Sequence, residues 1–228
     1  QEELDFFSAL ASDVAMAIRN AQLFEDLKKE ADRNRNLFIQ TTIALASAIE
    51  AKDAYTHGHT ERVTKYSLAI AKQMEFSGDN IFPPKFFENL YIAGLLHDIG
   101  KIAIPEAILS KQAKLTHEEY EIMKTHTTRG AEILAPLTGF KECINGVKYH
   151  HENYDGSGYP EGLKGDEIPL VASIIAVADA FDAMTTQRPY RKGLTKQEAI
   201  EEIKKCTGSQ FNPKPVKALL ELFVKEEL

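Results

Sequence analysis

The first 57 residues contain neither glycine nor proline, and this stretch constrains the fold more than any other feature of the sequence. Apolar residues recur in it at spacings of three and four, from Phe7 through Leu10 and Val14 to Phe24. Because nothing in the stretch breaks a helix, this periodicity predicts one long amphipathic helix with at most one interruption. Its middle, residues 28–36, is strongly polar and is typical of a solvated connector.

We therefore predict a domain boundary in this polar stretch, with residues 1–36 as a helical linker segment and residues 37–228 as one domain. An apolar stripe on such a helix also predicts a homodimer, formed by a coiled-coil-like contact between two copies. A helix that packs along its own domain is the alternative that the sequence leaves open.

The rest of the chain reads as helices with short breaks, so the predicted fold class is all-α. Helices are expected over residues 38–52, 60–74, 86–97, 116–134, 143–150, 170–185, 196–205 and 213–224. Thr116 followed by Glu119 predicts a capping box at one helix start. The least helical stretch, residues 152–169, contains four glycines and two prolines. A loop of this length indicates a function.

Composition excludes some classes of protein. The net charge is -7, which argues against long nucleic acid as a partner, because such partners require a basic surface. Cys143 and Cys206 form no paired framework, which favours a reducing compartment and a cytoplasmic location. The most apolar stretch, residues 171–184, is too short to span a bilayer and contains two aspartates, so no membrane segment is expected.

Histidines and aspartates carry the chemistry. They occur as a His-x-His pair ending at His59, as the adjacent His97 and Asp98, as a lone His126, as the adjacent His150 and His151, and as Asp179 within an apolar helix. A single buried histidine is more often a core residue than a ligand. His97 and Asp98, however, follow an apolar helix, where a carboxylate is costly unless a cation neutralises it. The combination therefore predicts a metal site.

These segments resemble the HD superfamily of metal-dependent phosphohydrolases and, more narrowly, its HD-GYP branch. The matching segments are DAYTHGHTERV (residues 53–63), LLHDIGKIAIPEAIL (95–109), HHENYDGSGYPEGLKGDEIP (150–169) and VADAFDAMTTQRPYR (177–191). The resemblance implies an HD-type helical bundle that hydrolyses cyclic di-GMP to linear pGpG, with further hydrolysis to GMP left open.

The resemblance also implies roles for individual residues. The implied metal ligands are His59, His97, Asp98, His126, His150, His151 and Asp179. Two divalent ions fit this set if Asp98 bridges them, and nitrogen-rich ligation suits transition metals, with iron or manganese favoured by the family. Some family members bind a third ion through an acidic residue four positions before the first ligand, but Tyr55 stands there, so a third ion is disfavoured.

The same resemblance implies which residues bind the substrate and take part in the reaction. Lys101 and Arg188 are expected to hold the phosphate, with Asp98 and Lys101 at the reacting centre. Asp182 is a candidate for protonating the leaving oxygen. Alternatively, it could hydrogen-bond to a metal ligand without binding the ion itself.

Glycine-rich residues are assigned to the substrate as well. Gly158, Tyr159 and Pro160 are expected to contact it, although the alternative is a glycine-rich turn that closes the core. Arg191 either joins them or pairs with a surface carboxylate. His57 and His117 are not expected to ligate.

Residues 10–27 (LASDVAMAIRNAQLFEDL) resemble the last helix of GAF sensory domains, which implies a sensor upstream and regulation of the enzyme. Two rival functions stay open. One is a phosphohydrolase for another cyclic dinucleotide or a nucleotide monoester. The other is a regulatory module that binds the dinucleotide, or a diguanylate cyclase, without turnover.

Overall fold

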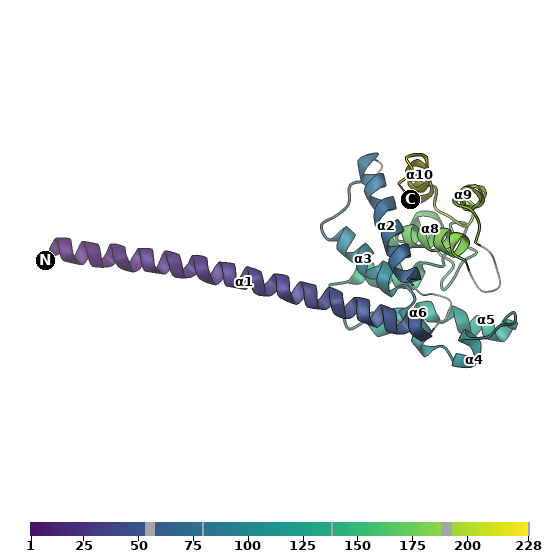
Figure 1. Ribbon diagram of the computed structural model, residues 1–228, viewed down its shortest axis with the longest axis horizontal. Helices are drawn as coiled ribbons and strands as arrows, with labels where there is room; N and C mark the ends of the chain where they lie inside the picture. The colour runs from purple at the N-terminus through teal and green to yellow at the C-terminus, as the bar shows by residue number, and fades with distance from the viewer. Residues whose placement is uncertain (53–57, 79, 138, 188–192, 228) are drawn as a thin grey trace. The chain divides into compact units, whose positions relative to one another are not determined.

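The structure is a computed structural model that describes residues 1–52, 58–78, 80–137, 139–187 and 193–227 (Figure 1). Within these ranges the backbone forms helices and loops, with one isolated bridge between Thr207 and Phe211 and no strand, so the all-α prediction is confirmed. The α-helices are α1 (Glu2–Lys52), α2 (His59–Phe76), α3 (Phe86–Leu96), α4 (Glu106–Leu109), α5 (His117–Lys124), α6 (His126–Leu134), α7 (Lys141–Tyr149), α8 (Leu170–Thr185), α9 (Lys196–Lys205) and α10 (Pro213–Val224). Two 3₁₀ helices are η1 (Ile99–Ala103) and η2 (Gly165–Glu167).

Helix α1 is uninterrupted over its full length, as the absence of glycine and proline predicts. The chain divides into two compact units, residues Gln1–Thr41 and residues Thr42–Leu228. In the first unit, apolar side chains such as Leu10 and Phe24 are exposed, at 48% and 73% of their surface. In the second unit, Ala46 and Ile49 of α1 are buried. The identity of residues 1–36 as a linker after a sensor stays a prediction.

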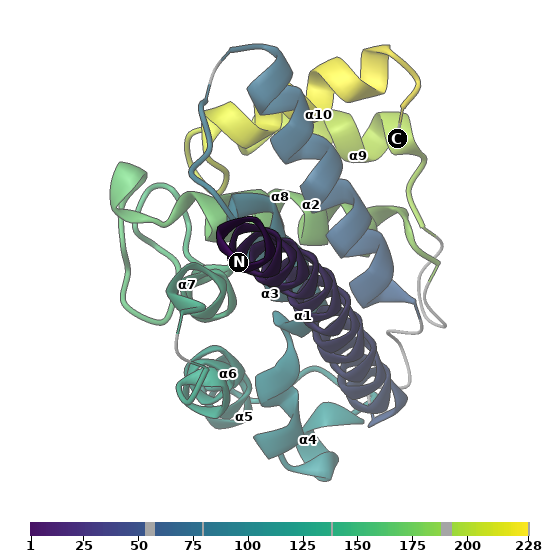
Figure 2. The ribbon, with the colours of Figure 1, turned by 90° about the vertical axis from the view of Figure 1, so that its left-hand side faces the viewer.

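The core of the second unit lies between α2, α3 and α8. Helix α2 packs against α3, α8 and α10, and α7 packs against α3 and α8. Ile70, Leu90, Ile174 and Phe181 are fully buried among them. Figure 2 shows α9 and α10 at one end of this unit and α4, α5 and α6 at the other, with α3, α7 and α8 between them. None of the described helices combines the length and apolar character needed to cross a membrane.

One predicted helix, over residues 116–134, is divided in the structure. The capping box of Thr116 and Glu119 is present, but α5 ends before Thr125 and α6 begins at His126. The Thr125 amide and hydroxyl both donate to the carbonyl of Ile122, at 3.1 and 2.6 Å. This local bonding competes with the regular helical ladder and divides the helix. The four-residue α4 was not predicted, because a helix this short shows no periodicity.

Candidate metal centre

Three histidines are fixed by backbone carbonyls at helix ends. The Nδ1 atoms of His97, His126 and His150 lie 2.8, 2.7 and 2.8 Å from the carbonyl oxygens of Gly94, Met123 and Val147, each three residues earlier. A proton on Nδ1 leaves the lone pair of Nε2 free. All three Nε2 atoms are buried and have no hydrogen-bond partner. Because buried polar atoms are rarely left without a partner, these atoms fit a bound metal ion.

His59, the first residue of α2, is fixed by a carboxylate instead. Its Nδ1 lies 2.7 Å from Oδ2 of Asp182, a side chain that is 1% exposed. Arg62 donates to both oxygens of Asp182, at 2.6 Å through Nε and at 3.0 Å through Nη2. On the other side of the ring, Nε2 of His59 lies 3.2 Å from Oδ1 of Asp179. Sequence reasoning missed Arg62, which lies 120 residues from its partner.

Asp98 lies between two sets of ligands. Its Oδ2 is 3.4 Å from Nε2 of His97, and its Oδ1 is 3.5 Å from Nε2 of His126. Lys101 Nζ contacts Oδ2 at 2.8 Å. One oxygen therefore faces each histidine, which is the arrangement that a bridging carboxylate requires.

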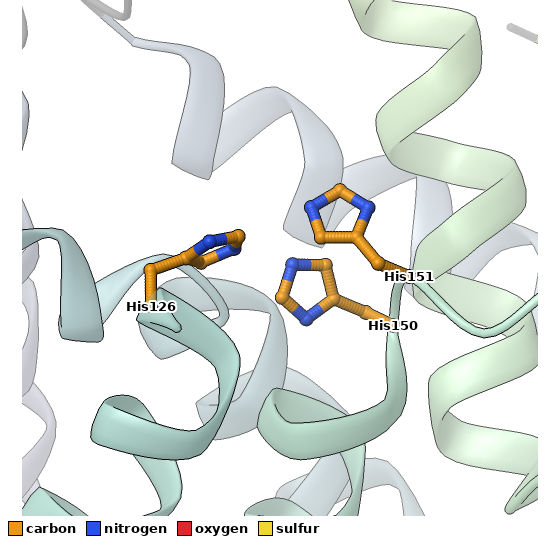
Figure 3. Close-up of side chains that lie close together, drawn as sticks. All are labelled: His126, His150 and His151. Atoms are coloured by element: carbon orange, nitrogen blue, oxygen red, sulfur yellow. The ribbon is translucent and has the colours of Figure 1, made fainter. Parts of the chain in front are cut away.

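The ligand atoms form two groups, within each of which all the atoms lie within 4.8 Å of one another. We call His59, His97 and Asp98 site A, and His126, His150 and His151 site B. Figure 3 shows the three rings of site B turned toward a common space. Asp179 adjoins site A through His59. All seven ligands predicted from sequence are thus brought together by α2, α3, η1, α6, α7 and α8.

The two sites differ in their protonation. Burial lowers the pKa of His126, sets the pKa of His150 well below its usual value, and lowers that of His151 to about 4. These imidazoles are therefore held in the neutral form that binds metal. Burial also lowers the pKa of His59, but hydrogen bonds to Asp179 and Asp182 outweigh it and raise that pKa to about 10.

The carboxylates of the centre are held in their charged form. Burial by itself raises the pKa of Asp98, but Lys101 and His97 lower it well below its usual value. Burial likewise raises the pKa of Asp179, and the hydrogen bond from His59 lowers it overall. Two anionic carboxylates among neutral and cationic side chains form a donor set that suits divalent cations with nitrogen and oxygen ligands.

Gly100 brings the two sites together. A Cβ atom at this position would overlap the backbone carbonyl of His126, so only glycine lets η1 lie against α6. Helix α6 packs against η1 along this contact. Asp98 and His126 of site B are therefore neighbours because residue 100 has no side chain.

The glycine-rich loop forms one wall of a cavity beside the metal centre. The Tyr159 amide donates to the carbonyl of His151 at 3.1 Å, and the two rings are 4.9 Å apart. The cavity measures about 370 Å³. Its lining includes Tyr120, His150, His151, Asn153, Gly158, Tyr159, Asp179 and Phe211. Lys124 lies 5.7 Å from the centre of the Tyr159 ring.

Glu152 holds this loop in place, a role that sequence reasoning missed. Its buried carboxylate accepts hydrogen bonds from the backbone amides of Glu161, Gly162 and Leu163, at 2.7, 3.1 and 3.1 Å. Gly158 is in close contact with the backbone of Glu152 and Asn153, where a Cβ would not fit. An acidic residue between a histidine pair and a glycine-rich loop was the available signal.

Several sequence-based assignments lie outside the described residues: Tyr55, His57, Arg188 and Arg191. His117, which was not expected to ligate, is exposed in the first turn of α5. Lys101 lies at the centre through its contact with Asp98. Pro160 follows Tyr159 in the chain and is not among the residues that line the cavity, and Asp182 contacts Nδ1 of His59.

A family model described as HD domain matches residues 44–214. A cyclic di-GMP phosphodiesterase of Thermotoga maritima is 46% identical over 76% of this chain and 46% of its own length. A cyclic di-GMP phosphodiesterase response regulator of Xanthomonas campestris is 37% identical over 87% of this chain and 50% of its own length. A 3'3'-cGAMP-specific phosphodiesterase of Vibrio cholerae is 38% identical over 77% of this chain and 37% of its own length.

The chain thus spans half or less of the length of these curated relatives. Among solved structures, a Vibrio cholerae cyclic GMP-AMP specific phosphodiesterase matches with a TM-score of 0.61 at 22% identity, over 80% of this chain and 48% of that chain. The HD domain of a Listeria monocytogenes phosphodiesterase in complex with cyclic-di-AMP matches with a TM-score of 0.55 at 20% identity, over 80% and 94% of the two chains. At these identities the structures support the fold alone.

Proposed function

Because this chain belongs to the HD domain family, we propose that it hydrolyses a phosphodiester of cyclic di-GMP to linear pGpG in a metal-dependent reaction. The observation that carries the proposal is the position of Asp98, whose two oxygens face the Nε2 atoms of His97 and His126. A carboxylate placed in this way can bridge two ions, and a pair of ions suits the hydrolysis of a phosphodiester.

Two ions would be held by the ligands of sites A and B, with Asp179 completing site A and Asp98 shared between the sites. Bound there, the ions would polarise the phosphoryl oxygens and activate the attacking water. The nitrogen-rich ligand set favours a transition metal, and we propose iron or manganese. A third ion is not part of the proposal.

The protein's own groups would position the substrate beside the ions. Lys101 is proposed to bind a non-bridging phosphate oxygen when a bound ion neutralises the negative charge of Asp98. Arg188 is proposed as a second side chain that binds the phosphate. Tyr159 and Gly158 offer a ring and an open backbone edge at the cavity, which suits a nucleobase and its ribose. Pro160 and Arg191 are proposed at the edge of the same contact.

Asp182 is better placed to orient His59 than to protonate a leaving group. Its carboxylate is occupied by His59 and Arg62. Burial by itself raises the pKa of Asp182, but the hydrogen bonds from His59 and Arg62 lower it overall, so the group carries no proton to give at neutral pH. We therefore assign Asp182 to the positioning of a ligand.

A second substrate, 3'3'-cGAMP, deserves the same assay, because relatives named for its hydrolysis are 38% identical to this chain. It differs from cyclic di-GMP in one nucleobase, so the ligands of the phosphodiester would be the same. The residues around the nucleobase cavity would then decide between the two substrates.

The test is to load the full chain with Mn²⁺ or Fe²⁺ and incubate it with each dinucleotide, separating the products by chromatography. We expect pGpG from cyclic di-GMP, and no product from the double variant H97A/D98A. Binding of cyclic di-GMP without any product from the metal-loaded wild type would favour the regulatory module instead. Faster turnover of 3'3'-cGAMP would reassign the substrate.

Partners and location belong to the same proposal. The exposed apolar side chains of α1, including Leu10, Val14 and Phe24, support a homodimer formed through this helix. A diguanylate cyclase is a proposed partner, because it makes the substrate. The free thiols of Cys143 and Cys206 support a cytoplasmic location.

A further inference from the structure

The last turn of α1 is bonded to the start of α2, which carries His59 of site A, and to the end of η1, which follows Asp98. Glu50 and Lys52 lie two residues apart and are both partly exposed. Glu50 contacts α2, and Lys52 contacts η1. The apolar side chains Ala46 and Ile49 bury this end of the helix in the second unit. These contacts serve none of the ligand or substrate roles described above.

Glu50 caps the start of α2. Its Oε2 accepts a hydrogen bond from the Gly58 amide at 2.9 Å, and its Oε1 accepts one from the Thr60 amide at 2.7 Å. The N-cap residue of α2, Gly58, has no side chain to do this. A carboxylate at a helix N-terminus satisfies free amides and is favoured by the helix dipole. The two bonded amides flank His59, so Glu50 fixes the backbone on both sides of a predicted ligand.

Lys52 binds the short segment that follows Asp98. Its Nζ donates to the carbonyl oxygens of Ile102 and Ile104, both at 3.0 Å. These carbonyls lie at the C-terminal end of η1, where a cation is favoured. The residue before η1 is Asp98, and Lys101 lies within it. Lys52 therefore fixes the short segment that carries the bridging carboxylate.

From these contacts we infer that Glu50 and Lys52 are positioning residues through which α1 sets the geometry of site A. The inference rests on the proposed metal centre and adds a regulatory input to it. Both side chains belong to the last turn of α1, so a rotation or shift of this turn moves them together. Site B receives its fixing bonds from the carbonyls of Met123 and Val147, which belong to α5 and α7.

The test uses the full chain and Mn²⁺ alone, with stepwise affinities measured by isothermal titration calorimetry. We expect Glu50→Gln to weaken one of the two Mn²⁺ affinities by about 10-fold, the lower end of what loss of an outer partner costs. We expect Lys52→Met to do the same and Lys52→Arg to retain wild-type affinity, because arginine keeps a cation at the η1 carbonyls. The matched controls are Glu25→Gln and Lys29→Met, which alter the same residue types in an exposed pair on the same helix.

Thermal unfolding separates positioning from general damage to the fold. Equal weakening of both affinities together with a lower melting temperature in Glu50→Gln would overturn the inference, as would unchanged affinities in both Glu50→Gln and Lys52→Met. A wild type that binds two ions but cleaves no dinucleotide would refute the proposed function alone. In that case a selective change in one affinity would still support the roles of Glu50 and Lys52.

Discussion

In site B the rings of His126 and His150 are held by backbone carbonyls. In site A the ring of His97 is held in the same way by Gly94, but the ring of His59 is held by Asp182, which is itself paired with Arg62. The carbonyls belong to helix ends and cannot move without the helices. The carboxylate of Asp182 and the guanidinium of Arg62 are side-chain groups from α8 and α2, and the ion pair between them holds both in position. We therefore expect single substitutions and changes in pH to alter site A, through His59, more than site B.

The largest effect is expected where the two sites meet. Asp98→Asn keeps the size of the side chain but removes the charge shared by both sites. Hydrolysis and Mn²⁺ content should fall by more than about 100-fold, since even the loss of an outer partner costs 10–100-fold. Activity assays and elemental analysis measure the two losses. The control is Asp166→Asn, an exposed aspartate. Retained metal in Asp98→Asn would refute the bridging role.

A substitution at Asp182 should weaken metal binding at one site and leave it nearly unchanged at the other. Asp182→Asn leaves Arg62 without its carboxylate and weakens the hold on His59. One Mn²⁺ affinity should fall by about 10–100-fold, while the other stays within a factor of about 2–3. Calorimetric titration resolves the two steps, and Glu202→Gln, an exposed carboxylate paired with Lys205, is the control. Equal losses at both steps would show that the sites are not held independently.

Metal affinity should depend on pH in site A more than in site B. The pKa of His59 is raised to about 10, so a proton must leave its Nε2 before an ion can bind at neutral pH. Affinity at site A should then rise by about tenfold per pH unit between pH 6 and 8 for each proton displaced. The pKa of His151 is lowered to about 4, so affinity at site B should stay nearly flat over this range. Mn²⁺ titrations at three pH values would measure both slopes, and equal slopes would contradict the comparison.

The smallest effect on the metals is expected from the loop. Glu152→Gln removes charge from three hydrogen bonds and should cost about 1–3 kcal/mol in the free energy of unfolding. It should raise KM, because the loop lines the cavity, and leave both Mn²⁺ affinities unchanged. Chemical denaturation and steady-state kinetics provide the measurements, with the exposed Glu132→Gln as the control. Loss of metal in Glu152→Gln would mean that the loop also holds His151 in place.

The two sites differ in how far their residues could be predicted from sequence. The seven residues of sites A and B and Asp179 were named as ligands through the resemblance to a known family, to which the adjacent histidines and the aspartate in an apolar helix pointed. Their role as metal ligands stays a prediction. Asp182 was named from sequence as a possible support for a ligand, but Arg62 and Glu50 were not, since Arg62 meets Asp182 across 120 residues and Glu50 has no special neighbours in the sequence. Charged residues such as these become able to position a ligand only when folding brings them next to it, which their local sequence does not show.

The limits of helix prediction have a similar cause. The continuous α1 followed from the absence of glycine and proline, whereas the division between α5 and α6 depends on a hydroxyl that bonds within its own turn. Apolar periodicity continues across Thr125 and does not reveal the break. That break nevertheless places His126 at a helix start, where its ring can face Asp98.

Glu50 and Lys52 lie two residues apart on the continuous α1, which places their side chains about 200° apart around the helix axis. One turn of helix therefore bonds the start of α2 and the end of η1 from nearly opposite faces. Inserting one residue between Glu50 and Lys52 would change this angle to about 300°, so we expect one of the two contacts to be lost.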